Sequence, residues 1–190
     1  MKNNLFLNIF FDTEFTELTQ NTQLLSIALV AETGEQFYAE CTDYHEKDIN
    51  EWVRENVIDN FTLTKTNLSD IRNIEIKDNR ARIAEYIKIW LQQFEIKNPG
   101  IQYQFWADVP HYDWVLFCEL FGGSFQRPEN IHYMCMDLAT LFLAKGVPPD
   151  YRRTDFLANH NMTVDGNQHN ALYDTLVCKK CYEILIEKTN

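Results

Sequence analysis

No stretch of this 190-residue sequence approaches the roughly 18–20 consecutive apolar residues of a membrane-spanning helix. An apolar run near the start is broken by Asp12 and Glu14, and the small-residue cleavage site of a signal peptide does not follow it. The five cysteines are odd in number and irregularly spaced, so they suggest no disulfide framework. We therefore expect a reduced, cytoplasmic protein without a membrane partner.

Glycine and proline are scarce, with six and five residues, and no Gly/Pro/Ser-rich linker divides the chain. The length is that of one ordinary domain, and apolar residues make up 45% of it. The sequence thus predicts a single domain over residues 1–190 and excludes disorder as the main description.

Positive charge is also in short supply. Lysine and arginine number 17 against 28 acidic residues, which gives a net charge of −11. The mean field of such a chain repels polyanions, which excludes tracking along a duplex by a basic surface. A short nucleic acid that binds at one metal-charged spot remains compatible with this charge.

Apolar patterning predicts an α/β fold. Buried or β-rich runs indicate five strands, at residues 5–11, 23–31, 36–41, 101–107 and 131–136. Residues 49–98 read as mostly helical, with a polar stretch near 59–80, and further helices are expected at 114–121, 138–145 and 170–187. This order favours a mixed five-stranded sheet with helices on both faces.

Acidic side chains stand where the predicted strands end. Asp12 and Glu14 alternate at the end of the first strand, so both point to the same side. Two carboxylates on one face repel each other unless a cation holds them, and a divalent metal prefers oxygen ligands. A strand end that simply meets solvent is the alternative.

Three further residues, in two segments of the chain, are candidates for the same site. Asp113 follows the fourth strand and opens an apolar helix, where it also suits the helix dipole. His169 and Asp174 are five residues apart, about 140° around a helix, so they do not stack like an i, i+4 pair. Either they reach one site from different directions, or both are simply exposed.

Together these motifs resemble the DEDDh family of 3′–5′ exonucleases, which have a ribonuclease-H-like fold. Asp12 and Glu14 match the first family motif, Asp113 the second, and His169 and Asp174 the third. The Asp-Thr-Glu-Phe-Thr and His-Asn-Ala-Leu-Tyr-Asp segments look most like the small mycobacterial-type bacterial 3′–5′ exoribonucleases. Three motifs in the right order carry this resemblance, which no single motif would.

The resemblance implies a two-metal phosphodiester hydrolase that uses Mg²⁺ or Mn²⁺. Asp12 would serve both ions, Glu14 and Asp174 the first, and Asp113 the second, while His169 would be the general base. The implied substrate is the 3′ end of single-stranded RNA, released as 5′-monophosphates. Similar enzymes commonly dimerise, so a homodimer is possible, although no feature of this sequence indicates one.

The residues themselves leave several assignments open. Asp108 also follows the fourth strand and is the alternative to Asp113 as the second-motif ligand. Phe15, Thr16 and Trp114 adjoin the motifs and are candidate substrate contacts, with core packing as the alternative for the two aromatic rings. Arg152 and Arg153 are candidate phosphate contacts or plain loop residues.

Three other functions compete with the exoribonuclease. The first is the same chemistry on DNA. The second is a non-catalytic RNA-binding protein on this fold, which usually lacks an acid or the histidine that is present here. The third is an acidic protein–protein module whose carboxylates only confer solubility.

Overall fold

The computed structural model describes residues 6–187. Its six-stranded sheet has the order β4-β3-β2-β1-β5-β6. The strands are β1 (Phe6–Phe15), β2 (Leu24–Ala31), β3 (Gln36–Cys41), β4 (Asn73–Asp78), β5 (Gln102–Ala107) and β6 (Met136–Asp137). β1, β2 and β3 are antiparallel neighbours, whereas β4 is parallel to β3 and β5 to both β1 and β6.

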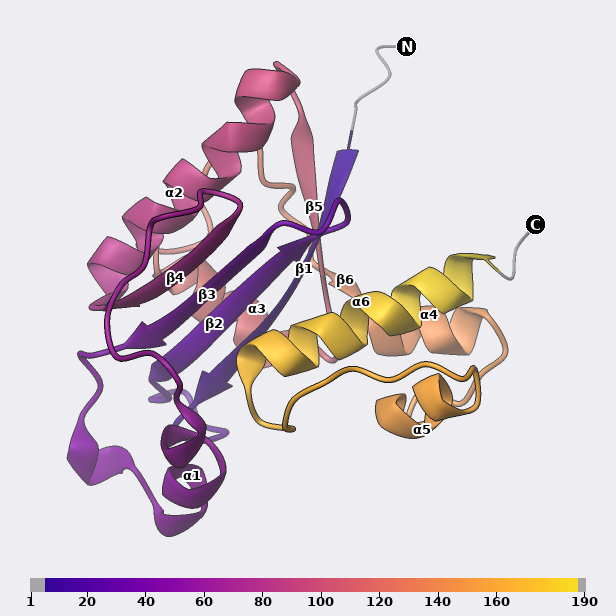
Figure 1. Ribbon diagram of the computed structural model, residues 1–190, viewed down its shortest axis with the longest axis horizontal. Helices are drawn as coiled ribbons and strands as arrows, with labels where there is room; N and C mark the ends of the chain where they lie inside the picture. Colours follow the sequence, from indigo (N-terminus) through magenta and orange to yellow (C-terminus); the bar gives the residue numbers. More distant parts are fainter. Residues whose placement is uncertain (1–5, 188–190) are drawn as a thin grey trace.

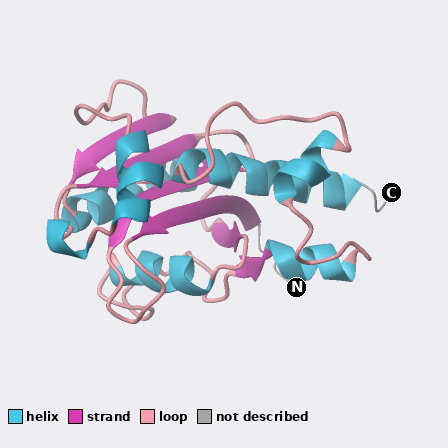
Figure 2. Cartoon of the chain, turned by 90° about the horizontal axis from the view of Figure 1, so that it is seen from below, coloured by secondary structure: helices cyan, strands magenta, loops and turns pink. Residues whose placement is uncertain are grey.

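Helices cover both faces of this mixed sheet, as the sequence predicts (Figures 1 and 2). The α-helices are α1 (Glu51–Asn56), α2 (Arg80–Lys97), α3 (His111–Glu119), α4 (Leu138–Ala144), α5 (Arg153–Ala158) and α6 (Ala171–Glu187), with short 3-10 turns at Glu46–Asp48 and Ile58–Asn60. None of the helices described over residues 6–187 combines the length and the apolar character needed to cross a bilayer.

Alternation along β1 divides the core into two layers. Ile9 and Phe11 pack into one cluster with the apolar faces of α2 and α3. Phe10 points the other way and packs with α4, α5 and α6. The helix face predicted within residues 83–94 is buried in the first cluster. β1 therefore lies at the centre of the molecule, with Asp12 on the same side as α6.

The predicted strand count of five is wrong, because β4 lies in the segment expected to be mostly helical. Only Ile74 and Ile76 of β4 are buried, whereas Asn73 and Glu75 beside them are exposed. An edge strand with one solvated face carries such a weak apolar signal. The expected strand at 131–136 is also shorter, with a single bridge at Ile131 before β6.

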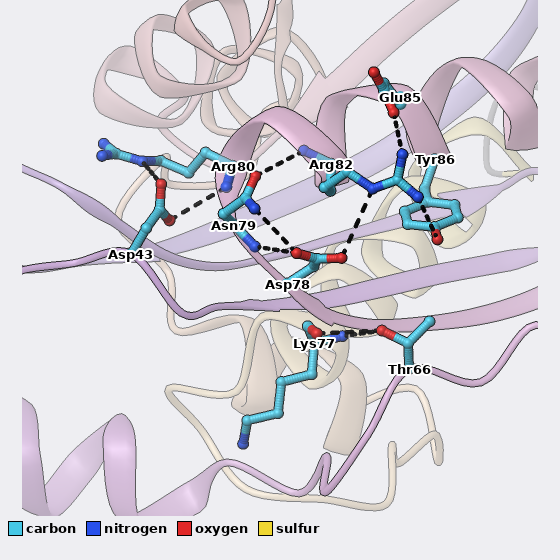
Figure 3. Close-up of polar contacts among 9 residues, drawn as sticks. All are labelled: Asp43, Thr66, Lys77, Asp78, Asn79, Arg80, Arg82, Glu85 and Tyr86. Atoms are coloured by element: carbon cyan, nitrogen blue, oxygen red, sulfur yellow. Dashed lines mark hydrogen bonds and ion pairs between the residues drawn. The ribbon is translucent and has the colours of Figure 1, made fainter.

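Polar contacts fix the passage from β4 into α2 (Figure 3). The Asn79 side chain accepts a hydrogen bond from the Arg82 backbone N–H and so caps α2. Asp78 accepts from the Asn79 backbone N–H, and Arg80 pairs with Asp43 beyond the end of β3. These contacts tie the start of α2 to the end of β4 and to the segment that follows β3.

Candidate active site

A cleft of about 430 Å³ lies where β1 and β5 end. Its lining comes from segments far apart in the sequence: the end of β1, α1, the turn after β5, and the starts of α3, α5 and α6. Figure 1 shows the end of β1, helix α1 and the start of α6 at the same corner of the sheet. All five residues predicted to be catalytic line this cleft, namely Asp12, Glu14, Asp113, His169 and Asp174.

Three of the acids form a compact group. Carboxylate oxygens of Asp12, Glu14 and Asp174 lie within 4.8 Å of one another. Asp174 reaches β1 because α6 packs closely on the sheet, with the small residues Ala28 and Ala171 fully buried between them. The alternation of β1 and the close approach of α6 thus bring the first and third motifs together.

The environment of these carboxylates raises their pKa values. Burial raises the pKa of Asp12 well above its ordinary value, and the negative charges of neighbouring acids, first Asp113 and then Glu14, raise it further. Burial, followed by the charges of Asp174 and Asp113, raises the pKa of Glu14 to about 8. A group of this kind lacks positive charge, which a bound cation would supply.

Asp174 and His169 are tied to each other through the backbone. Burial raises the pKa of Asp174 to about 6, although a 2.9 Å hydrogen bond from the His169 backbone N–H opposes the shift. His169 has φ of +66°, a left-handed conformation, immediately before the Asn170 side chain caps α6. Its ring meets Trp52 edge-on at 4.9 Å, and burial lowers the imidazole pKa, so the ring is neutral near pH 7.

Asp113 is buried beside this group. Its Oδ1 accepts hydrogen bonds from the Thr13 backbone N–H at 3.0 Å and from the Thr13 hydroxyl at 2.7 Å. Thr13 lies between Asp12 and Glu14 on β1, so these bonds join the first motif to the second. Burial raises the pKa of Asp113, and the bonds from Thr13 partly offset the shift.

Asp108, the alternative ligand, has a different partner. It forms a two-pronged ion pair with Arg153, at 2.9 Å to Nε and 2.7 Å to Nη2. Arg152 also lines the cleft, but its side chain is exposed and has no ion pair among the described residues. The two adjacent arginines therefore sit in unlike surroundings.

The three predicted substrate contacts are placed differently from one another. Phe15 lines the cleft and stacks on Tyr112 with ring centroids 5.5 Å apart. Thr16 is buried and accepts a hydrogen bond from the Gln23 backbone N–H, outside the cleft lining. Trp114 stacks on Phe117 in the aromatic core and is likewise absent from the lining.

Two apolar side chains at the cleft were not anticipated. Trp52 of α1 and Leu18 are both exposed and line the cleft. Neither belongs to a motif, and α1 lies in a polar region whose sequence pattern gives no indication of what it covers. The one local signal for Trp52 is a tryptophan within the mostly polar segment Glu51–Asn56.

Solved structures share this architecture. The nuclease domain of 3'hExo, a DEDDh family member bound to rAMP, aligns with TM-score 0.64 and 12% identity over 100% of this chain and 96% of that chain. Cell-death related nuclease 4 (CRN-4) aligns with TM-score 0.64 and 12% identity, over 98% of this chain and 65% of that chain. S. pombe Pop2p in its Mg²⁺- and Mn²⁺-bound form aligns with TM-score 0.57 and 13% identity, over 96% of this chain and 83% of that chain. These likenesses confirm the predicted ribonuclease-H-like fold.

Sequence comparison gives the family. The 3'-5' exoribonuclease Rv2179c of Mycobacterium tuberculosis strain H37Rv is 28% identical over 142 residues, which cover 75% of this chain and 77% of that protein. The 3'-5' exoribonuclease MT2234.1 of strain CDC 1551 matches equally well. The model of the protein family described as "3'-5' exoribonuclease Rv2179c-like domain" matches residues 7–186. The chain therefore belongs to the Rv2179c-like 3′–5′ exoribonuclease family, which confirms the enzyme class that the three motifs predict.

Proposed function

We propose that this exoribonuclease is metal-dependent and removes nucleotides one at a time from the 3′ end of single-stranded RNA, releasing 5′-monophosphates. The observation that carries the proposal is the convergence of Asp12, Glu14 and Asp174 within 4.8 Å, beside His169. The proposal treats residues 1–190 as one catalytic domain.

The donor set suits a hard divalent cation. The three grouped acids and Asp113 offer only carboxylate oxygens, which Mg²⁺ and Mn²⁺ prefer, whereas zinc sites usually contain nitrogen or sulfur. Burial raises the pKa values of Asp12, Glu14 and Asp174, and the charges of neighbouring acids raise them further, so a bound cation would favour the charged forms of these carboxylates. Two divalent ions, when bound, would activate the attacking water and neutralise charge on the phosphate and the departing oxygen.

Each acid has a distinct role in this proposal. Asp12, on the central strand, would bind both ions, Glu14 and Asp174 would bind the first, and Asp113 the second. Thr13 fixes the Asp113 carboxylate through two hydrogen bonds and leaves Oδ2 for a ligand. Asp113 is favoured over Asp108 because both oxygens of Asp108 are engaged by Arg153.

His169 would accept the proton of the attacking water at a ring nitrogen. Its lowered pKa keeps the imidazole neutral and able to accept that proton. Among the described residues, none forms a hydrogen bond with either ring nitrogen, and the edge contact with Trp52 holds the ring in place.

The cleft walls provide contacts for one strand end. Trp52 and Phe15 present aromatic surface, and stacking on aromatic rings suits unpaired bases of any sequence. The exposed guanidinium of Arg152 would contact a backbone phosphate. Thr16 and Trp114 play no direct part in this arrangement.

The test is a 5′-labelled single-stranded RNA incubated with the pure protein in Mn²⁺ or in EDTA. We expect a ladder that shortens from the 3′ end in Mn²⁺, no reaction in EDTA, and no reaction on RNA that carries a 3′-phosphate. Cleavage of a circular RNA would contradict the exonuclease assignment. Faster hydrolysis of the matching DNA would favour the exodeoxyribonuclease alternative.

The cytoplasmic location and the homodimer are also proposals. All five cysteines are free thiols, and four of them are buried, which suits a reducing compartment. Sedimentation analysis of the purified protein tests the dimer.

A further inference from the structure

The Asp108–Arg153 pair lies at the edge of the acidic group and has no role in the proposed chemistry. Asp108 directly follows β5, and because Phe10 on β1 pairs with Trp106 on β5, Asp108 comes level with Asp12 on the parallel strand. The charge of Asp108 contributes to the raised pKa values of Asp12, Asp113 and Asp174. Asp108 is therefore a fifth carboxylate of the same electrostatic cluster.

Arg153 is committed to holding this carboxylate. Besides its two bonds to Asp108, it donates from Nη2 to the Pro149 carbonyl at 2.9 Å and from Nη1 to the Tyr151 carbonyl at 2.5 Å. Its guanidinium also lies 4.1 Å from the centre of the Phe142 ring, and only 13% of the side chain is exposed. With four N–H groups already used, Arg153 is poorly placed to bind phosphate, unlike Arg152.

We propose that Arg153 is a positioning residue for the metal site, which holds Asp108 in an ion pair and so keeps this fifth carboxylate from taking a metal ion. Five carboxylates and one guanidinium leave four negative charges, which two divalent ions balance. Without Arg153, Asp108 would be an unpaired acid beside Asp12 and would be free to bind a further cation. The inference rests on the proposed metal dependence.

The experiment titrates Mn²⁺ into the RNA-free protein by calorimetry and measures steady-state RNA hydrolysis in parallel. In Arg153→Gln, we expect an additional Mn²⁺ equivalent and a kcat lower by roughly 10- to 100-fold, the usual effect of losing a partner that orients metal ligands. In the double variant Asp108→Asn/Arg153→Gln, the acid that needs a partner is gone. We therefore expect the wild-type stoichiometry and a kcat within about 3-fold of wild type.

Arg152→Gln is the matched control, since it removes the neighbouring positive charge. It should leave the Mn²⁺ isotherm unchanged and raise KM instead of lowering kcat. If Arg153→Gln is too unstable to study, Asp108→Asn alone decides the question. It should keep the wild-type stoichiometry, and loss of a Mn²⁺ equivalent would show that Asp108 is itself a ligand.

Two results would overturn the inference while the proposed function stands: a wild-type isotherm and kcat in Arg153→Gln, or a double variant as impaired as Arg153→Gln. If the wild-type protein bound no Mn²⁺ at all, the proposed function itself would fail.

Discussion

At the scale of the residue, Asp12 is the acid on which most of the repulsion converges. It is half-buried, and the charges of four other carboxylates add to the effect of burial in raising its pKa. We expect Asp12→Asn to raise the melting temperature of the metal-free protein, because the cost of either charging or protonating this carboxylate in the folded state is removed, and to abolish the rise that Mn²⁺ causes in the wild type. Thermal denaturation in EDTA and in Mn²⁺ checks both effects. Glu119→Gln, at an exposed acid outside the cleft, should keep the Mn²⁺ effect.

Glu14 makes the metal-free stability depend on pH. Its pKa is raised from 4.5 in the unfolded chain to about 8 in the folded protein, so the folded state binds the proton more tightly. The stabilisation is therefore complete below pH 4.5 and is lost as pH rises through 8. In EDTA, we expect the stability of the wild type relative to Glu14→Gln to fall between pH 5 and 8. A difference that rises over this window would contradict the assignment, and saturating Mg²⁺ should flatten it.

Substitution of His169 distinguishes an effect on the rate of hydrolysis from an effect on metal binding. Because φ at this position is +66°, asparagine is a gentler replacement than alanine, since it tolerates left-handed backbone. We expect His169→Asn to bind Mn²⁺ and RNA nearly as the wild type does while kcat falls by roughly 10²- to 10⁴-fold. The pH–rate profile at saturating Mn²⁺ should lose a titration that the exposed-site control His45→Asn retains. Near-normal turnover in His169→Asn would show that His169 lies beside the site without acting as the general base.

The residues that the sequence could and could not place differ in a physical way. Asp12 and Glu14 follow from strand alternation, which is local. For Trp114, adjacency to Asp113 is weaker guidance, because neighbouring residues on a helix are rotated by about 100°, and its ring packs against the core while Asp113 faces the cleft. Its contact with substrate stays a prediction. The position of Trp52 at the cleft could not be predicted from the sequence, since it depends on where the whole of α1 packs.

At the scale of the element, a buried acid joins β3 to the loop that precedes β4. Glu40 is fully buried and accepts hydrogen bonds from the backbone N–H groups of Thr62 and Leu63, with Lys77 of β4 at 3.4 Å. Glu40→Ala should lower the free energy of unfolding by about 3–5 kcal/mol, because two backbone N–H groups lose their acceptor and Lys77 keeps only its hydrogen bond to the Leu63 carbonyl. Urea denaturation measures this loss. Glu40→Gln keeps an acceptor oxygen and should cost clearly less, whereas equal losses would show that the side chain only fills space.

The same edge explains why β4 escaped prediction. Its stability comes from pairing with β3 and from contacts such as Glu40–Lys77, which join residues 37 positions apart. The local pattern offers only Ile74 and Ile76, too short a run to outweigh the helical character of its surroundings. The central strands and α2 were predictable because their apolar runs are long enough for the spacing of apolar residues to distinguish a strand from a helix.

At the scale of the whole molecule, net charge limits how RNA is held. The protein carries a net charge of −11, and the cationic side chains of the described cleft lining are Arg152 and Arg153. Arg153 is already paired with Asp108, so one phosphate contact is available to a free guanidinium. Binding should therefore depend on a short stretch at the 3′ end and on the proposed metal site, and little on the length of RNA beyond it.

This limit predicts a shallow salt dependence. For single strands the slope of log affinity against log salt is about −0.7 per phosphate contact, so we expect about −0.7 for log(1/KM) as KCl is varied at fixed Mn²⁺. Arg152→Gln should bring the slope close to zero, because its guanidinium makes that contact. A slope of about −3 or steeper would require four or more contacts, and thus a basic RNA track that the acidic surface argues against. The same series on RNAs of increasing length distinguishes the two, since only an extended track makes the slope grow with length.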